Sequence, residues 1–434
     1  MKTNEQNRQG NIFSGLLFSV FALLVYIILV LLISRPLLGW IALGKSDEEG
    51  LLSAVRLDSK NPTYHYLLGR YYHMDLNNPD MEKAIRQYRE SLISSPLQAG
   101  AWIDLSKAYQ ITGQNAEAEY ALERAAKLSP NNPDLMWEAG TFWLINNMTD
   151  KAVSALSRYI LLMPDKQSEV YDLCWKLKLD NSYILTDLIP ESYEYGAGYL
   201  MYLMKTKRAG ESQEVWKVLD KNRLDKKMFI SYVNFLINNK LYEEAGNIWK
   251  ETTEKIEGMG KNEDSSIVWN NSFENEMLNG GFDWFISEVE GANVFIDEAI
   301  RMTGNRSLGV TFDGKHNPDV TIAQQVVRVS PGIKYILRSY IKTDSLTTTN
   351  GIIINVQGHN CSGLYKKSDA MTGTNFWREV TLDFETPAEC RAVIVKIRRE
   401  RSAKFDNKIE GTAWIDGISL KQQADFLKSS SRKP

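Results

Sequence analysis

The sequence contains few of the residues on which metal centres and disulfide-rich folds depend. Its 434 residues include three cysteines and four histidines, which excludes a four-thiolate metal site and a disulfide-dense scaffold. The histidines are also too widely spaced for a zinc motif with two histidines on one helical turn. A formal charge of −3 lacks the basic excess that nucleic-acid binding usually requires. The length allows two or three domains with apolar cores of their own.

Two of the cysteines leave a question open. Cys361 and Cys390 both lie in the C-terminal part of the chain. They would form a disulfide if this part folds in an oxidising compartment. Free, half-buried thiols are the alternative, and this is the state that we expect from the sequence.

One long stretch contains no charged residue. Residues 12–33 read IFSGLLFSVFALLVYIILVLLI, and a helix with a rise of about 1.5 Å per residue crosses a hydrocarbon core of about 30 Å over this length. A cleaved signal peptide would have a shorter apolar core and small residues at its cleavage site, whereas bulky residues follow Arg35. We therefore expect a single uncleaved transmembrane anchor. Basic residues flank the span on both sides, so their distribution does not decide its orientation. We place residues 1–11 in the cytoplasm because the long remainder is a translocatable, periplasmic part.

A pattern of small and large apolar residues recurs every 34 positions between Pro62 and Pro164. A small residue at the eighth position and an alanine at the twentieth allow two antiparallel helices to pack closely, and a proline ends the second helix. A third copy begins upstream at His65. Two successive copies match at eight positions: Trp102, Leu105, Ser106, Tyr109, Ala118, Leu122, Ala125 and Pro130, then Met136, Ala139, Gly140, Trp143, Ala152, Leu156, Tyr159 and Pro164.

This pattern resembles the tetratricopeptide repeat, which implies a solenoid of stacked helix pairs with a concave groove for a peptide or a partner protein. Residues 45–164 carry the repeats, and residues 165–254 continue them in a degenerate form. The alternative for the groove positions is that they pack a later helix. By the repeat template, the fifth, ninth and twelfth positions of each first helix face the groove: Tyr66, Arg70, His73, Ile103, Lys107, Gln110, Trp137, Thr141 and Leu144.

From residue 267 the apolar period changes from helical to alternating. About eight or nine short strands with turn residues between them predict an antiparallel β-sandwich over residues 267–420. Residues 255–266, rich in charge and glycine, are expected to form a linker, and residues 421–434 a solvated tail. The predicted strands are bounded by Gly, Pro, Asn or Asp: residues 292–299, 307–312, 321–329, 333–343, 351–358, 377–384, 391–398 and 412–420.

The two ends of this β region resemble the first and last strands of the jelly-roll carbohydrate-binding modules that recognise cellulose, xylan and related glycans. The resemblance rests on residues 271–284, with NSFE and NGGFDW, and on residues 413–420, which read AWIDGISL. It implies a structural calcium ion held by Glu274 and Asp416, since calcium accepts oxygen ligands from distant strands. The alternative is that the two carboxylates satisfy backbone donors near the strand ends. No other cofactor is expected.

Alternation along two strands predicts a polar sheet face. Aromatic rings cover the C–H faces of sugars, and planar polar groups bind their hydroxyls. A glycan would bind here, or the residues form an ordinary solvated face. A basic run between Lys396 and Lys404 would likewise meet an anionic polysaccharide or lipid headgroup, or would form a solvated strand end. If the two strands are neighbours, five side chains share the open face: Arg338, Tyr340, Asn355, Gln357 and His359.

The combined parts predict a membrane-anchored, non-enzymatic scaffold that binds a protein partner and a glycan. The architecture is similar to that of proteins of bacterial exopolysaccharide systems, and this analogy implies an anchor in a bacterial inner membrane. A structural scaffold whose sandwich binds protein is the alternative. A glycan-processing enzyme would need two carboxylates across a cleft, and Asp383 and Glu385 occupy neighbouring strand positions that form no such pair.

Overall fold

The computed structural model describes residues 2–45, 47–75, 78–253, 266–405 and 407–425. The chain divides into two compact units, Met1–Tyr199 and Leu200–Pro434. The predicted linker lies outside the described residues except for its last residue, Ser266. The predicted tail was placed too early, because Lys421 and Gln422 still belong to the last strand.

The first helix, α1 (Lys2–Leu43), is longer than the predicted span and runs through Pro36. Its apolar part, Phe18–Leu43, has exposed side chains such as that of Phe21, and it is long and apolar enough to cross a membrane. The helix passes the predicted end at Ile33 by a further ten residues. Its C-terminal part contacts the helices that follow, since the Tyr64 hydroxyl donates to the carbonyl of Pro36 at 3.3 Å.

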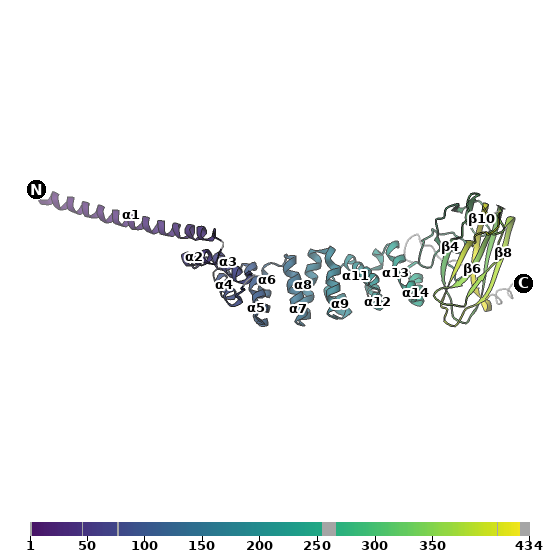
Figure 1. Cartoon of the computed structure of the whole chain (residues 1–434), viewed down its shortest axis with the longest axis horizontal. Coiled ribbons are helices and arrows are strands. Elements are labelled where there is room, and N and C mark those ends of the chain that lie inside the picture. The colour runs from purple at the N-terminus through teal and green to yellow at the C-terminus, as the bar shows by residue number, and fades with distance from the viewer. Residues whose placement is uncertain (1, 46, 76–77, 254–265, 406, 426–434) are drawn as a thin grey trace. The chain divides into compact units, whose positions relative to one another are not determined.

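The repeat segment forms paired helices as the 34-residue period predicts (Figure 1). N-cap side chains start two of the first helices, where Asn61 and Asn132 accept from backbone N–H groups just ahead of a proline at the first helical position. A capping helix, α2 (Glu48–Leu57), precedes the pairs. The packed pairs are α3 (Pro62–Met74) with α4 (Met81–Ser94), α5 (Ala99–Ile111) with α6 (Asn115–Leu128), and α7 (Pro133–Ile145) with α8 (Thr149–Leu162).

The eighth position of each pair explains the close helix packing. A Cβ atom added to Gly69 would lie 2.7 Å from the ring of Tyr88, and one added to Gly140 would lie 2.5 Å from Leu156. In the middle pair this position is Ser106, whose hydroxyl donates to the carbonyl of Ala118 at 2.9 Å. A larger residue at this position would force the two helices of a pair apart.

The helical arrangement continues after Leu162, but the strict period does not. A short α10 and a π-helical turn stand where a regular second helix would follow α9. The chain then returns to helices of ordinary length. The later elements are η1 (Pro164–Lys166), α9 (Gln167–Lys176), α10 (Asn181–Tyr183), η2 (Ile184–Leu188), α11 (Tyr193–Lys205), α12 (Ala209–Val218), η3 (Lys221–Arg223), α13 (Lys226–Asn238) and α14 (Tyr242–Thr253).

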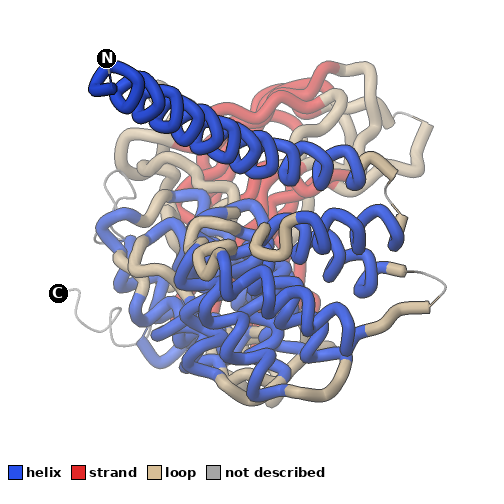
Figure 2. Tube along the Cα trace, turned by 90° about the vertical axis from the view of Figure 1, so that its left-hand side faces the viewer, coloured by secondary structure: helices blue, strands red, loops and turns tan. Residues whose placement is uncertain are grey.

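Two five-stranded antiparallel sheets form the expected sandwich (red in Figure 2). We call them sheet A and sheet B. In spatial order, sheet A consists of β1 (Phe285–Ile286), β4 (Val320–Arg328), β9 (Ala392–Arg399), β6 (Ile352–Gly358) and β7 (Tyr365–Lys367). In spatial order, sheet B consists of β2 (Ala292–Asp297), β3 (Ser307–Asp313), β10 (Glu410–Gln422), β5 (Lys334–Leu346) and β8 (Gly373–Glu385).

The core lies between the two sheets and follows the alternation of the strands. Trp284 is fully buried in it, beside Phe273. Cys361 and Cys390 form a disulfide within the sandwich. The expectation of two free thiols is therefore wrong, because the fold brings the two sulfur atoms into bonding contact.

The last two helices pack on the sandwich within the second unit. The Tyr242 hydroxyl lies 2.9 Å from Nδ1 of His359, and Arg328 of β4 pairs with Glu243 at 2.8 Å. Trp249 of α14 contacts the rings of Trp269 and Phe282 edge-on. The boundary between the compact units therefore falls near residue 199, and not in the predicted linker.

Candidate functional site

Polar side chains connect the first helices of successive repeats. The Tyr66 hydroxyl donates to Asp104 at 2.9 Å, and Arg70 lies 3.8 Å from the same carboxylate. Lys107 pairs in the same way with Glu138 of the next repeat, at 3.0 Å. In both cases a cation at the ninth position meets an acid at the sixth position of the following first helix. Three of the predicted groove residues thus form a continuous polar row with two acids that the sequence analysis did not select.

Three other predicted groove residues come together in a pocket. Gln110, Trp137 and Thr141 line a cavity of about 560 Å³ at α5 and α7. The indole of Trp137 packs on the ring of Tyr159, with centroids 5.2 Å apart. The buried hydroxyl of Thr141 has no hydrogen-bond partner in the described part of the chain. A pocket lined by an aromatic ring, an amide and a hydroxyl without a hydrogen-bond partner can receive one side chain of a bound peptide.

The remaining groove candidates contribute less. His73 is turned toward its own pair, where Nδ1 lies 3.1 Å from the Tyr88 hydroxyl, and burial lowers the pKa of its imidazole. Ile103 is half-buried, and Leu144 is buried in the core. For Leu144 the alternative interpretation, packing, therefore applies.

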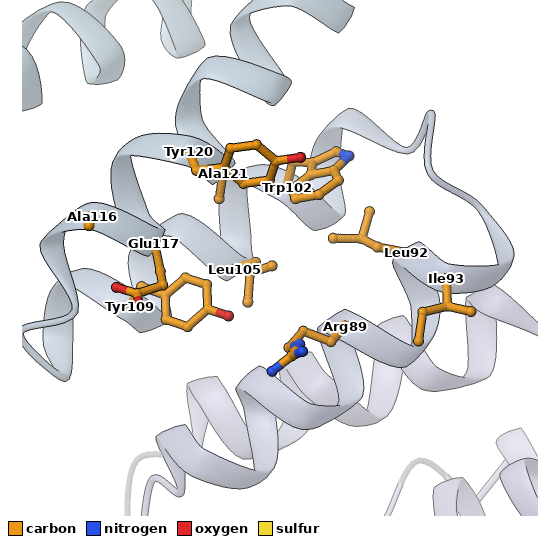
Figure 3. A pocket seen from close by; sticks show the side chains of 10 residues that line it. All are labelled: Arg89, Leu92, Ile93, Trp102, Leu105, Tyr109, Ala116, Glu117, Tyr120 and Ala121. Carbon is orange, nitrogen blue, oxygen red and sulfur yellow. The ribbon is translucent and has the colours of Figure 1, made fainter.

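A second pocket lies on the side of the second helices, which the sequence analysis did not consider (Figure 3). It has a volume of about 570 Å³ and lies between α4, α5 and α6. Trp102, Tyr109 and Tyr120 supply its aromatic walls, and Arg89 and Glu117 supply its charges. A similar pocket of about 710 Å³ recurs one repeat later, where Met136 and Trp143 occupy equivalent positions. In the sequence, the apolar residues on the outward side of the second helices were the signal that could have predicted these two pockets.

The predicted polar sheet face is divided between the two sheets. Arg338 and Tyr340 lie on β5 of sheet B, whereas Asn355 and Gln357 lie on β6 of sheet A. The assumption that the two strands are neighbours is therefore wrong. Arg338 and Tyr340 both contact Glu379 on β8. His359 lies beyond the end of β6 and is occupied by its contact with α14 described above. Their roles in glycan binding stay predictions.

The outer face of sheet A carries a row of side chains that crosses all five strands. Residues directly opposite each other in antiparallel strands lie on the same face, and their neighbours along β6 and β9, such as Ile354 and Val395, belong to the core. The row therefore faces away from the core. It consists of Phe285 on β1, Gln324 on β4, Lys396 on β9, Asn355 on β6 and Lys367 on β7.

Asn355, near the middle of this row, is the least satisfied polar residue of the face. Its side chain is fully buried, and neither its amide oxygen nor its amide nitrogen has a hydrogen-bond partner among the described residues. Leaving a buried polar group unpaired costs about 1–3 kcal/mol. On the neighbouring strand, burial lowers the pKa of the half-buried Lys396. Gln357 and Tyr365 are paired in the next row of the same face.

The two predicted calcium ligands hold the same loop in place. Glu274 accepts from the backbone N–H groups of Asn305 and Arg306, at 2.7 and 3.0 Å. Asp416 accepts from the N–H groups of Met302 and Thr303, at 2.7 and 2.8 Å, and burial raises the pKa of this carboxyl. N–H groups point their hydrogens at the oxygens, which fits an anchor for a loop and not a cation site. No cluster of three metal-ligating side chains occurs in the described residues, and calcium binding stays a prediction.

One member of the basic run is structural. Arg399 is fully buried, and its guanidinium donates to the backbone carbonyls of Asn350, Pro318 and Asn407. It therefore fastens three loops and is neither a solvated strand end nor a surface cation.

Known proteins are similar to parts of this chain. No protein-family model matches the sequence. Anaphase-promoting complex subunit 3 of Schizosaccharomyces pombe is 31% identical over 83 residues, 19% of this chain; the chain spans only 12% of that relative.

Two solved structures resemble different parts of the chain. MamA is 17% identical and covers 50% of this chain and 93% of its own, with a TM-score of 0.26. TmCBM61 in complex with β-1,4-galactotriose is 14% identical and covers 37% of this chain and 100% of its own, with a TM-score of 0.26. TM-scores this low do not support a fold assignment. The assignment of helix pairs and a β-sandwich therefore rests on the 34-residue period and on the contacts described above. The chain combines tetratricopeptide-like helix pairs with a C-terminal β-sandwich that resembles carbohydrate-binding modules.

Proposed function

We propose that the protein is a membrane-anchored, non-enzymatic scaffold in the assembly or export of a polysaccharide. Its helix pairs bind a protein partner, and its β-sandwich binds a glycan on the outer face of sheet A. One observation carries the glycan assignment: the buried amide of Asn355 has no partner among the described residues. A sugar hydroxyl would supply both a donor and an acceptor to this amide once the side chains that cover Asn355 move aside.

Glycan binding can be tested on the full chain in lipid nanodiscs. The wild-type protein binds at least one polysaccharide of a glycan array, and Asn355→Val weakens this binding. Arg338→Ala, on sheet B, is the matched control and leaves binding unchanged. Absence of binding to every glycan on the array contradicts the proposal. Loss of binding in the control alone moves the site to sheet B.

The disulfide and the N-terminal helix support an anchored protein with its soluble part outside the cytoplasm. Disulfides persist in oxidising compartments and are rare in the cytosol, and the bond between Cys361 and Cys390 lies in the sandwich. α1 supplies the apolar length for a membrane span. The periplasm of a bacterium combines both conditions.

The pocket at Trp137 supports a protein partner for the helix pairs. We expect a partner protein that cross-links to the wild type in cells not to cross-link to the Trp137→Ala variant. Binding energy concentrates on aromatic side chains that become buried in an interface. Trp102→Ala alters the pocket on the other side of the helix pairs (Figure 3) and retains the partner. Retention by both variants excludes the pocket at Trp137 as the binding site.

Exposed aromatic rings favour a second candidate function, in which the sandwich binds protein and not sugar. The side chains of Phe376 and Phe405 are 90% and 106% exposed, and aromatic side chains are enriched at protein–protein interfaces. Under this alternative, Phe376→Ser releases a partner of the sandwich, and the glycan array stays negative.

A further inference from the structure

We propose that the glycan bound by sheet A is acidic, and that Lys396 and Asn355 receive its carboxylate together. The inference rests on the proposed glycan binding and adds the chemical class of the ligand. It depends on which charges of the face are already neutralised, and on what the unpaired amide beside them can donate.

Among the described residues, four cations lie on the outer face of sheet A, and three of them already have acidic partners. Arg328 pairs with Glu243 at 2.8 Å. Lys367 pairs with Glu400 at 2.8 Å, and Arg398 pairs with Asp319. Lys396, two residues before Arg398 on β9, has no ion pair with any described residue. Its half-buried position makes an unpaired charge more costly than at an open surface site. The face therefore holds one cation whose counter-charge must come from outside.

The partner on the adjacent strand complements that cation. Asn355 and Lys396 are directly opposite each other on β6 and β9, which places their Cβ atoms about 4.5–5.5 Å apart on one face. A carboxylate has two oxygen atoms, so one can accept from the ammonium of Lys396 and the other from the amide nitrogen of Asn355. The amide oxygen then accepts from a hydroxyl of the same sugar.

A neutral glycan would satisfy the amide but not the charge. Hydroxyl groups can pair with both amide atoms of Asn355, yet they leave Lys396 without a counter-ion in a half-buried position. A uronic acid supplies the carboxylate and the hydroxyls within one sugar ring. Gln324 and Gln357, on the two neighbouring strands of the same face, are available for the hydroxyls of adjacent sugars.

The test compares a polyuronate with the same polymer after chemical reduction of its carboxyl groups. The full chain in nanodiscs of neutral lipid is titrated with polygalacturonate and with carboxyl-reduced polygalacturonate, and affinity is measured by biolayer interferometry. We expect reduction of the polymer to weaken binding by at least about tenfold, since a charge-assisted hydrogen bond is lost. Lys396→Gln and Asn355→Val each produce a similar loss. Lys334→Gln, which makes the same charge change on β5 of sheet B, leaves the affinity unchanged.

Four outcomes separate this inference from the function on which it rests. Equal binding of the reduced and the unreduced polymer overturns the acidic class and leaves glycan binding intact. Binding to neither polymer, together with a negative glycan array, overturns both. Equal binding of polyglutamate, with the same loss in Lys396→Gln, overturns the inference because the face would then read charge and not sugar. Melting temperatures of the variants within a few degrees of the wild type show that a lost affinity reflects the site and not the fold.

Discussion

At the residue scale, burial sets the protonation of Asp283. The side chain is 2% exposed, and burial raises its pKa to about 6. One carboxylate oxygen accepts from the N–H of Leu278 at 2.7 Å, whereas the other has no partner in the described residues. The charged form is therefore poorly compensated at neutral pH.

This predicts an unusual pH dependence of stability. Because the folded pKa lies above the unfolded value of 3.8, the contribution of Asp283 to stability is complete below pH 3.8 and is lost as the pH rises through about 6. Asp283→Asn keeps an acceptor without the charge, so we expect its free energy of unfolding at pH 7.5 to exceed that of the wild type by up to about 3 kcal/mol. The gain should be smaller at pH 5. Urea unfolding at both pH values measures this, and an equal effect at both contradicts the assigned pKa.

A stability prediction accompanies the proposed binding role of Asn355. Asn355→Val removes two unpaired polar atoms from a buried position and introduces a residue that favours strands. We expect the free energy of unfolding to rise by about 1–2 kcal/mol, although the variant binds its glycan less well. Gln357→Val, a half-buried position on the same strand, should change stability by less. A loss of stability in Asn355→Val would show that the amide has a partner in solution.

The sequence could predict part of the candidate site and not its assembly. Alternation correctly placed Asn355 and Gln357 on the outward face of their strand. It could not show that Arg338 lies in the other sheet, because a period of two sets the face of a residue but not the neighbours of its strand. Lys396 was noticed as a basic residue, but its position beside Asn355 depends on long-range strand pairing.

At the element scale, glycine at the eighth repeat position determines how closely two helices pack. Gly140 faces Leu156 across the α7–α8 pair. The added methyl of Gly140→Ala cannot fit without moving a helix, and we expect a loss of about 1–3 kcal/mol in the free energy of unfolding. Gly210→Ala in α12 is the control, because nothing lies within 4 Å of its added Cβ, and it should gain about 0.5–1 kcal/mol from helix propensity. Chemical denaturation of both variants measures the two changes, and gains of equal size would show that helix propensity and not packing determines the effect at both positions.

The disulfide makes a second prediction at this scale. The bond closes a loop of 29 residues, and removing it should cost about 3–4 kcal/mol through the entropy of the unfolded chain. Urea unfolding of the Cys361→Ser/Cys390→Ser double variant measures this loss. Thiol titration of the denatured wild-type protein should find one thiol before reduction and three afterwards. Three thiols before reduction would show that the bond does not form.

The sequence predicted long elements better than short ones. All eight predicted strands occur within a few residues of their expected bounds. β1 and β7 were missed, because strands of two and three residues show no alternation. The π-helical turn Ile184–Leu188 was equally invisible, since its hydrogen bonding has no sequence signature comparable to a cap or a proline.

At the scale of the whole molecule, we expect α1 to determine where the protein is found. We expect the full chain to remain in the membrane pellet after extraction at high pH, because about 20 apolar residues suffice for a span and its apolar part has 26. Replacing Leu24 and Ile28 by lysine should release it into the soluble fraction, since each charge opposes insertion. The same change at Ile93 and Leu97, which are exposed elsewhere, is the control. A wild-type chain found in the soluble fraction contradicts the anchor.

The packing of α13 and α14 on the sandwich affects how this protein would respond to a protease. The chain between Thr253 of α14 and Ser266 joins the last two helices to the sandwich. Yet the ion pair at Glu243, the hydrogen bond at Tyr242 and the rings around Trp249 also join the two sides. A molecule cut within this segment would keep both pieces together under native conditions, and they would separate only in denaturant. The β-sandwich would stay attached to α13 and α14 after the chain itself had been broken.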